Sequence, residues 1–217
     1  MSLLMSPLAQ VTTEKAKGIR VKFVIVGDKE VGKTTLASNF TKETPHSNTS
    51  FGIETYKAKY IKNDEIFVFE IVDTQSDGFL KQIKGEYNKA NFVLIVFDLT
   101  NRESFLSIDN WITHINSSDN QNLEIILVGN KNDLVEKRQV SQDEATRLAK
   151  TNKMRYYEIS AMNKEGIEPI FKNAFNEFYG SIEDMFDLND SNLIKISDNM
   201  NIIKFLNDNE AQCFCWC

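Results

Sequence analysis

The sequence predicts an α/β fold in which helices cover both faces of a mostly parallel, six-stranded sheet. Residues 92–97 are apolar without interruption, as expected of a strand that is buried on both faces. Strand-like segments alternate along the chain with segments of helical apolar spacing, which favours parallel strands joined by helices. Because ligands of such sheets bind where the strands end, the loops after the strands are the expected position of a site.

Six segments are predicted as strands because they are short and rich in β-branched and aromatic residues. They are residues 21–26, 54–61, 65–72, 92–97, 123–128 and 155–159. Only Lys62-Asn63-Asp64 separates the second from the third, which predicts a hairpin and one antiparallel strand. Residues 41–50 are rich in Thr, Ser and Asn and include Pro45, so they are predicted as a loop.

The segments between the strands have a helical pattern. In residues 102–116 the apolar positions recur at helical spacing, and Ser141 with Glu144 three residues later matches a helix N-terminal cap. The predicted helices are residues 34–40, 78–89, 102–116, 141–152 and 167–179.

Length and composition predict one folded domain, at residues 19–180, between a flexible extension (1–18) and a mostly disordered tail (181–217) rich in Asn, Asp and Ser. The net charge of −6 argues against a nucleic-acid partner, which usually needs a basic face. The first ten residues do not resemble a secretory signal, and no stretch approaches the roughly 20 apolar residues of a membrane span. We therefore expect the protein in the cytosol or at the cytosolic face of a membrane.

All three cysteines lie within the last five residues, at Cys213, Cys215 and Cys217. A disulfide framework would place cysteines throughout the fold, and a structural zinc site would add spaced partners. Their confinement to the tail favours chemical modification of the tail.

The turn after the first strand reads Gly27-Asp28-Lys29-Glu30-Val31-Gly32-Lys33-Thr34 and is followed by Thr35. This spacing predicts a phosphate-binding loop, in which the glycines let successive backbone N–H groups point at phosphates. Lys33 is expected to reach the β- and γ-phosphates, and the Thr34 hydroxyl to join Mg²⁺. A chance Gly-Lys-Thr in a surface turn is disfavoured, because a strand precedes the motif and a helix follows it.

Two later loops are expected to bind the base. Asn130-Lys131-Asn132-Asp133 follows a buried strand, and a buried Asp133 carboxylate could accept from the N1–H and the amine of guanine. Adenine lacks these donors, which disfavours an ATP-using kinase with the same phosphate loop. Ser160-Ala161-Met162 follows the last strand, and the N–H of Ala161 is expected to face the guanine O6.

With these motifs in order over residues 20–180, the chain resembles the Ras superfamily and most of all its Rab branch. Residues 97–105 and the pair Asn130 and Asp133 are particularly similar to Rab proteins. The resemblance implies a small G-domain of the P-loop NTPase class that is active with GTP and inactive with GDP, with Mg²⁺ as cofactor. It also implies effector proteins, an exchange factor, a GTPase activator, and escort and dissociation-inhibitor proteins.

The end of the sequence fits the same resemblance. Cys215-Trp216-Cys217 has the Cys-x-Cys pattern that carries two geranylgeranyl groups in Rab proteins, and two chains give stable anchoring. The extra Cys213 leaves open which cysteines are modified. The resemblance therefore implies attachment to the cytoplasmic face of an endomembrane or vesicle and a role in vesicle transport.

The chain departs from the family in switch II. Asp73 stands where the family holds Mg²⁺ through water, but the family sequence Asp-Thr-Ala-Gly-Gln-Glu is replaced by Asp-Thr-Gln-Ser-Asp-Gly. Ser76 thereby takes the place of the γ-phosphate-sensing glycine, and Asp77 that of the catalytic glutamine. Ionised Asp77 cannot donate a hydrogen bond to orient water. Gln75 could take the role of the glutamine only from a shifted loop. Hydrolysis of GTP is therefore predicted to be slow.

The phosphate loop and switch I also depart from the family. Lys29 and Glu30 occupy positions where small residues are common. Either Lys29 crowds the catalytic water or pairs with the γ-phosphate, or both side chains point to solvent. Ser50 takes the place of the Mg²⁺-binding threonine, with Thr49 as the adjacent alternative. Val72 stands where Rab proteins usually carry tryptophan, which predicts atypical effectors.

Two functions remain open at this point. One is a GTPase that acts as a timed switch, and the other is an adaptor that stays bound to GTP and recruits partners.

Overall fold

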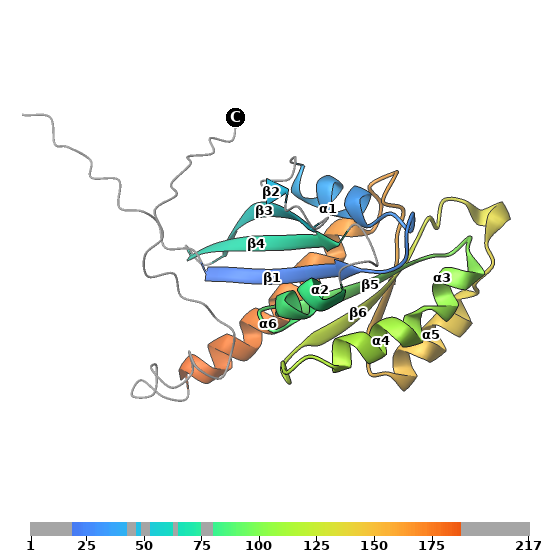
Figure 1. The fold of residues 1–217 in the computed structure, drawn as a ribbon. Helices are drawn as coiled ribbons and strands as arrows, with labels where there is room; N and C mark the ends of the chain where they lie inside the picture. Colours follow the sequence, from blue (N-terminus) through green and yellow to red (C-terminus); the bar gives the residue numbers. More distant parts are fainter. Residues whose placement is uncertain (1–18, 43–46, 49–52, 63–64, 75–79, 188–217) are drawn as a thin grey trace, which may run out of the picture.

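A computed structural model describes residues 19–42, 47–48, 53–62, 65–74 and 80–187, which form a single seven-stranded sheet with helices on both faces (Figure 1). The strands are β1 Ile19–Val26, β2 Ser47–Asn48, β3 Ile53–Lys62, β4 Glu65–Thr74, β5 Phe92–Asp98, β6 Glu124–Asn130 and β7 Arg155–Glu158. The helices are α1 Lys33–Thr41, α2 Leu80–Tyr87, α3 Arg102–Leu106, α4 Ile108–Asn116, the short 3-10 turn η2 Val135–Lys137, α5 Gln142–Thr151 and α6 Ile167–Asp187.

The order of the strands across the sheet is β2-β3-β4-β1-β5-β6-β7. β1 is parallel to β4 and β5, and the parallel pairing continues through β6 to β7. β3 runs antiparallel to β4, which confirms the predicted hairpin. All six predicted strands are present, and the mostly parallel α/β fold is confirmed.

Three features of the structure differ from the sequence prediction by more than one or two residues at the end of an element. The two-residue strand β2 lies in the segment predicted as loop, where Ser47 and Asn48 pair with Thr55 and Glu54. The helix predicted at 102–116 is two helices that meet at Ser107, whose side chain donates to the carbonyl oxygen of Glu103 at 3.1 Å. α6 continues to Asp187, past the predicted beginning of the tail at 181.

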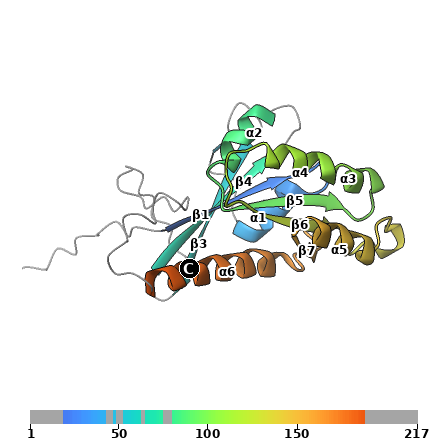
Figure 2. The same ribbon diagram turned by 90° about the horizontal axis from the view of Figure 1, so that it is seen from below.

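The core consists of two apolar layers, one on each face of the sheet. Alternate residues of β1 enter opposite layers: Phe23 belongs to the layer that includes residues of α1 and α6, and Val24 to the layer that includes residues of α2, α4 and α5. Figure 2 shows α6 on one side of the sheet and α2 and α4 on the other. Every residue of β5 is buried, as predicted for a strand covered on both faces. None of the helices in the described part of the chain combines the length and apolar character that a membrane span requires.

The polar residues of interest lie at one edge of this sheet. β1, β5, β6 and β7 are parallel, so the loops that follow them all leave from the same edge. The phosphate loop and both predicted base-binding loops are among these connections. The fold therefore brings together motifs that are far apart in the sequence.

Candidate nucleotide-binding site

The phosphate loop has the backbone conformation that its glycines predict. Gly27 and Gly32 have φ values of 138° and 100°, which L side chains rarely adopt. A Cβ atom at Gly27 would lie 2.1 Å from the carbonyl oxygen of Val96, so this loop approaches β5 too closely for any side chain.

Two residues of this loop bear on the alternatives that the sequence left open. The side chains of Lys29 and Glu30 are both exposed, which favours the interpretation in which they point to solvent. Glu30 has a φ of 63°, a left-handed conformation that costs roughly 1 kcal/mol for a residue with a Cβ atom. The loop therefore carries backbone strain at Glu30.

Lys33 is the first residue of α1 and is 6% exposed. Its ammonium donates to the carbonyl oxygens of Gly27 and Asp28, both at 2.7 Å. The cation therefore lies inside the curve of the loop and next to the N-terminus of a helix. Both the charge and the helix dipole favour an anion at this place.

Thr34 and Asp73 meet at the carboxyl end of β4. The Thr34 hydroxyl donates to Oδ2 of Asp73, while Oδ1, also buried, accepts no hydrogen bond from the described residues. Burial raises the pKa of Asp73, while the Thr34 hydrogen bond and the charge of Lys33 act in the opposite direction. A hydroxyl beside an incompletely satisfied, buried carboxylate is a set of oxygen donors that fits Mg²⁺.

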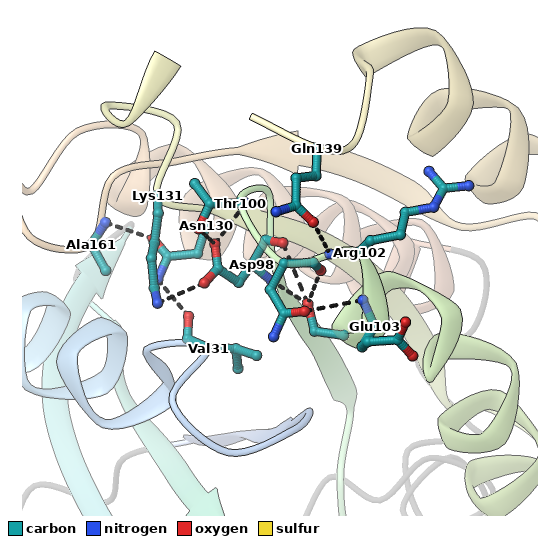
Figure 3. A network of polar contacts seen from close by, with 11 residues as sticks. Val31, Asp98, Thr100, Arg102, Glu103, Asn130, Lys131, Gln139 and Ala161 are labelled. Atoms are coloured by element: carbon teal, nitrogen blue, oxygen red, sulfur yellow. Dashed lines mark hydrogen bonds and ion pairs between the residues drawn. The ribbon is translucent and has the colours of Figure 1, made fainter. Parts of the chain in front are cut away.

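Asn130 joins the phosphate loop to the loop after β7 (Figure 3). Its side-chain amide donates to the carbonyl oxygen of Val31 at 2.7 Å and accepts from the N–H of Ala161 at 2.9 Å. The sequence placed that N–H opposite the guanine O6; in the structure it is bonded to Asn130. Asn130 is 2% exposed, so these two bonds are an internal brace of the site.

Lys131 is held by a residue that the sequence analysis did not single out. Its ammonium lies 2.7 Å from Oδ2 of Asp98, the last residue of β5 (Figure 3). The other oxygen, Oδ1, accepts from the N–H and the hydroxyl of Thr100, at 2.8 and 2.7 Å. Asp98 is 6% exposed. The sequence did contain a signal for a functional role of Asp98, namely a carboxylate at the end of a buried strand.

The residues expected to face the base differ from the prediction in their exposure. Asp133 and Met162 are exposed, whereas the guanine argument assumed a buried Asp133 carboxylate. Ser160 is fully buried, and its hydroxyl accepts from the N–H of Asn163 at 3.0 Å. The two base loops are tied by the N–H of Asn132, which donates to the carbonyl oxygen of Ile159 at 3.0 Å.

An ion pair next to these loops joins the residue after η2 to the last residue of β7. Nη1 and Nη2 of Arg138, just after η2, both donate to the carboxylate of Glu158, and the Tyr156 hydroxyl also donates to it at 2.7 Å. Burial alone would raise the pKa of Glu158, but the hydrogen bonds from Arg138 and Tyr156 outweigh burial and lower it.

Several predicted site residues lie outside the described part of the chain. Lys29, Val31, Lys33, Thr34, Thr35 and the base-loop residues are described. The residues outside are Thr49 and Ser50 of switch I, Gln75, Ser76 and Asp77 of switch II, and Cys213, Cys215 and Cys217. Val72 is described and is 1% exposed, packed in the layer that includes α2 and α4.

Comparison with known proteins agrees with this geometry. A sequence profile of the Ras family matches residues 22–180. The chain is 35% identical over 154 residues to Ras-related protein Rab-4 of Dictyostelium discoideum, covering 70% of this chain and 75% of that protein. It is 30% identical to Rab-11A of the same organism over 161 residues (73% and 75% covered), and to RABA5a of Arabidopsis thaliana over 169 (76% of each). The chain belongs to the Ras family and, within it, to the small GTPases of the Rab type.

Proposed function

We propose that this protein is a guanine-nucleotide switch that binds GTP and GDP with Mg²⁺ and recruits effectors to the cytoplasmic face of an endomembrane or vesicle. The observation that carries the proposal is the position of Asn130, bonded to both Val31 of the phosphate loop and Ala161 of the last base loop. This brace holds the phosphate-binding and base-binding parts at a fixed separation. A nucleotide is the ligand that needs both.

Different residues at this edge of the sheet would bind different parts of the nucleotide. Lys33 and the N-terminus of α1 favour the phosphates, and Asp133 provides acceptors for the donors of guanine. Thr34 and Asp73 would hold Mg²⁺, with Ser50 of switch I as a further oxygen donor. Mg²⁺ would neutralise phosphate charge when bound.

We propose further that hydrolysis is slow, because Asp77 replaces the glutamine that orients water. A carboxylate cannot donate a hydrogen bond and adds negative charge near the phosphates. Gln75 lies two positions earlier and is the remaining amide in this segment. Ser76 restricts the backbone where the family has glycine.

Single-turnover GTP hydrolysis tests this part. The comparison is between the wild-type protein, Asp77→Gln and Ser76→Gly/Asp77→Gln, each loaded with GTP to the same occupancy and checked for retained nucleotide. The double variant should hydrolyse GTP at least about tenfold faster than wild type, which corresponds to roughly 1.4 kcal/mol of barrier. Equal rates in all three proteins would refute the assignment of the defect to switch II.

The same substitution favours a second candidate function, an adaptor that remains bound to GTP. The nucleotide that co-purifies with the protein, separated by chromatography, distinguishes the two. Mostly GTP supports the adaptor; mostly GDP supports a switch that turns over, provided that a protein loaded with GTP converts it in the absence of free nucleotide.

Membrane attachment is proposed through Cys215 and Cys217, whose Cys-x-Cys pattern resembles the doubly prenylated ends of Rab proteins. Intact mass measurement of the protein isolated from eukaryotic cells should show two prenyl groups. The Cys215→Ser/Cys217→Ser variant should lose both groups and its membrane fraction. Membrane recovery unchanged in that variant would rule out this anchor.

A further inference from the structure

A hydrogen bond joins the phosphate loop to α4, a helix that lies far from the loop in the sequence. The indole N–H of Trp111, in α4, donates to Oδ1 of Asp28 at 2.8 Å, across 83 positions of sequence. Asp28 follows the first glycine of the phosphate loop. Its own carbonyl oxygen is one of the two that accept from the Lys33 ammonium. One residue of the loop therefore connects α4 to the Lys33 ammonium.

The donor in this pair is fixed in place. Trp111 is 7% exposed and packs in the apolar layer that includes α2 and α4, with its ring edge-on to His114 at a centroid distance of 6.5 Å. An indole N–H can only donate, so its partner must be an acceptor. A rigid donor aimed at a loop residue constrains that residue more than a flexible surface side chain would.

The position of the Asp28 carboxylate, the acceptor in this pair, matters electrostatically. Asp28 is a carboxylate within a loop that binds phosphates, and like charges a few ångströms apart repel each other. The bond to Trp111 keeps this carboxylate against α4. It thereby separates the negative charge from the interior of the loop, where the Lys33 ammonium lies.

We propose that Trp111 is a positioning residue of the nucleotide site, which holds the Asp28 carboxylate away from the phosphates and the Asp28 carbonyl against Lys33. The inference rests on the guanine-nucleotide binding proposed above. It extends that site to a residue of α4 outside all of its motifs.

The test is the dissociation rate of a fluorescent GDP analogue from the full-length protein with Mg²⁺. Trp111→Phe keeps an aromatic ring but removes the donor, and should release the nucleotide at least about tenfold faster, as expected for the loss of a hydrogen bond to a charged group. Asp28→Asn in the Trp111→Phe background removes the freed charge. It should bring the rate back to within about twofold of the Asp28→Asn single variant, because coupled residues give non-additive effects.

A matched control separates positioning from a general loosening of α4. The Tyr87 hydroxyl contacts Nδ1 of His114 at 3.2 Å in the same region, and Tyr87→Phe removes this contact without touching Asp28. Tyr87→Phe should release the nucleotide at the wild-type rate. Far-UV circular dichroism and thermal unfolding establish that each variant is folded.

Three outcomes would overturn the inference. They are a Trp111→Phe rate within twofold of wild type, no recovery in the double variant, and a Tyr87→Phe rate as fast as that of Trp111→Phe. A wild-type protein that does not bind the analogue would instead overturn the proposed function, and this inference with it.

Discussion

Asn130 donates its side-chain N–H to the carbonyl oxygen of Val31 at 2.7 Å, which ties the end of β6 to the phosphate loop. The same amide accepts from the N–H of Ala161 at 2.9 Å. The two bonds join backbone segments that are neighbours only in the folded protein. They make Asn130 a structural brace as well as a member of the base-binding motif.

Replacing Asn130 by Ala should therefore destabilise the fold. It leaves a buried carbonyl and a buried N–H without partners, and each such group costs about 1–3 kcal/mol, so we expect a loss of about 2–4 kcal/mol in the free energy of unfolding. Urea unfolding measures it. Asn163→Ala, at an exposed side chain of the same edge, should change stability by less than about 0.5 kcal/mol. Equal losses in both variants would contradict the brace.

Two glycines provide a contrasting pair. In Gly27→Ala the new Cβ atom would meet the Val96 carbonyl oxygen at 2.1 Å, at a φ of 138°, so we expect a loss of about 3 kcal/mol or more. In Gly85→Ala, within α2, nothing lies within 4 Å of the new atom. Alanine is the better helix former, so this variant should gain about 0.5–1 kcal/mol. Thermal unfolding measures both, and a stable Gly27→Ala protein would be inconsistent with the close approach of the loop to β5.

Asp98 should matter for nucleotide retention although it lies outside the motifs. Asp98→Ala removes the partner of the Lys131 ammonium and leaves the N–H of Thr100 without its acceptor. We expect a fluorescent GDP analogue to dissociate at least about tenfold faster, in keeping with the roughly 1.5–3 kcal/mol of a hydrogen bond to a charged group. Asp119→Asn, at an exposed position, is the control. Unchanged dissociation in Asp98→Ala would show that Lys131 does not need this support.

Acid should weaken the ion pair between Arg138 and Glu158. Because the pKa of Glu158 is lowered in the folded protein, its charge stabilises the fold above the ordinary glutamate range, and this stabilisation is lost as the pH falls through the lower, folded-state value. The difference in unfolding free energy between wild type and Glu158→Gln should therefore shrink as the pH falls from about 6 to about 3. Urea unfolding at several pH values measures it. A difference that grows on acidification has the wrong sign for this ion pair.

The sequence predicted the strands well because their composition is decisive. The first six of the seven residues of β5 are apolar. Such an uninterrupted run does not have the spaced apolar positions of an amphipathic helix. The break between α3 and α4 was missed because Phe105, Ile108 and Trp111 keep helical spacing across Ser107. β2 was missed because two polar residues carry no alternation, and they pair only because β3 has an open edge beside them.

The site was predicted by its motifs but not by its internal bonds. Gly27 and Lys33 carry their own local signal, since the spacing of the loop specifies their roles. The pairs Asp98–Lys131 and Asp28–Trp111 have no local signal, because each joins two elements that only the sheet topology brings together. Asp133 was expected to be buried, but it lies in an exposed loop, which the sequence pattern did not reveal.

Central to the proposed function is that the Asp133 carboxylate selects guanine by accepting hydrogen bonds from the base. Guanine presents two donors to that carboxylate, whereas xanthine replaces the amine with a carbonyl oxygen that only accepts. The direct measurement is the Kd of GDP and of xanthosine diphosphate for wild type and Asp133→Asn, with Mg²⁺. Wild type should prefer GDP by about 100-fold or more, and Asp133→Asn should prefer xanthosine diphosphate, because its amide can donate to the new carbonyl. A wild-type protein that binds both nucleotides equally, or a variant that keeps the wild-type preference for GDP, would contradict the account.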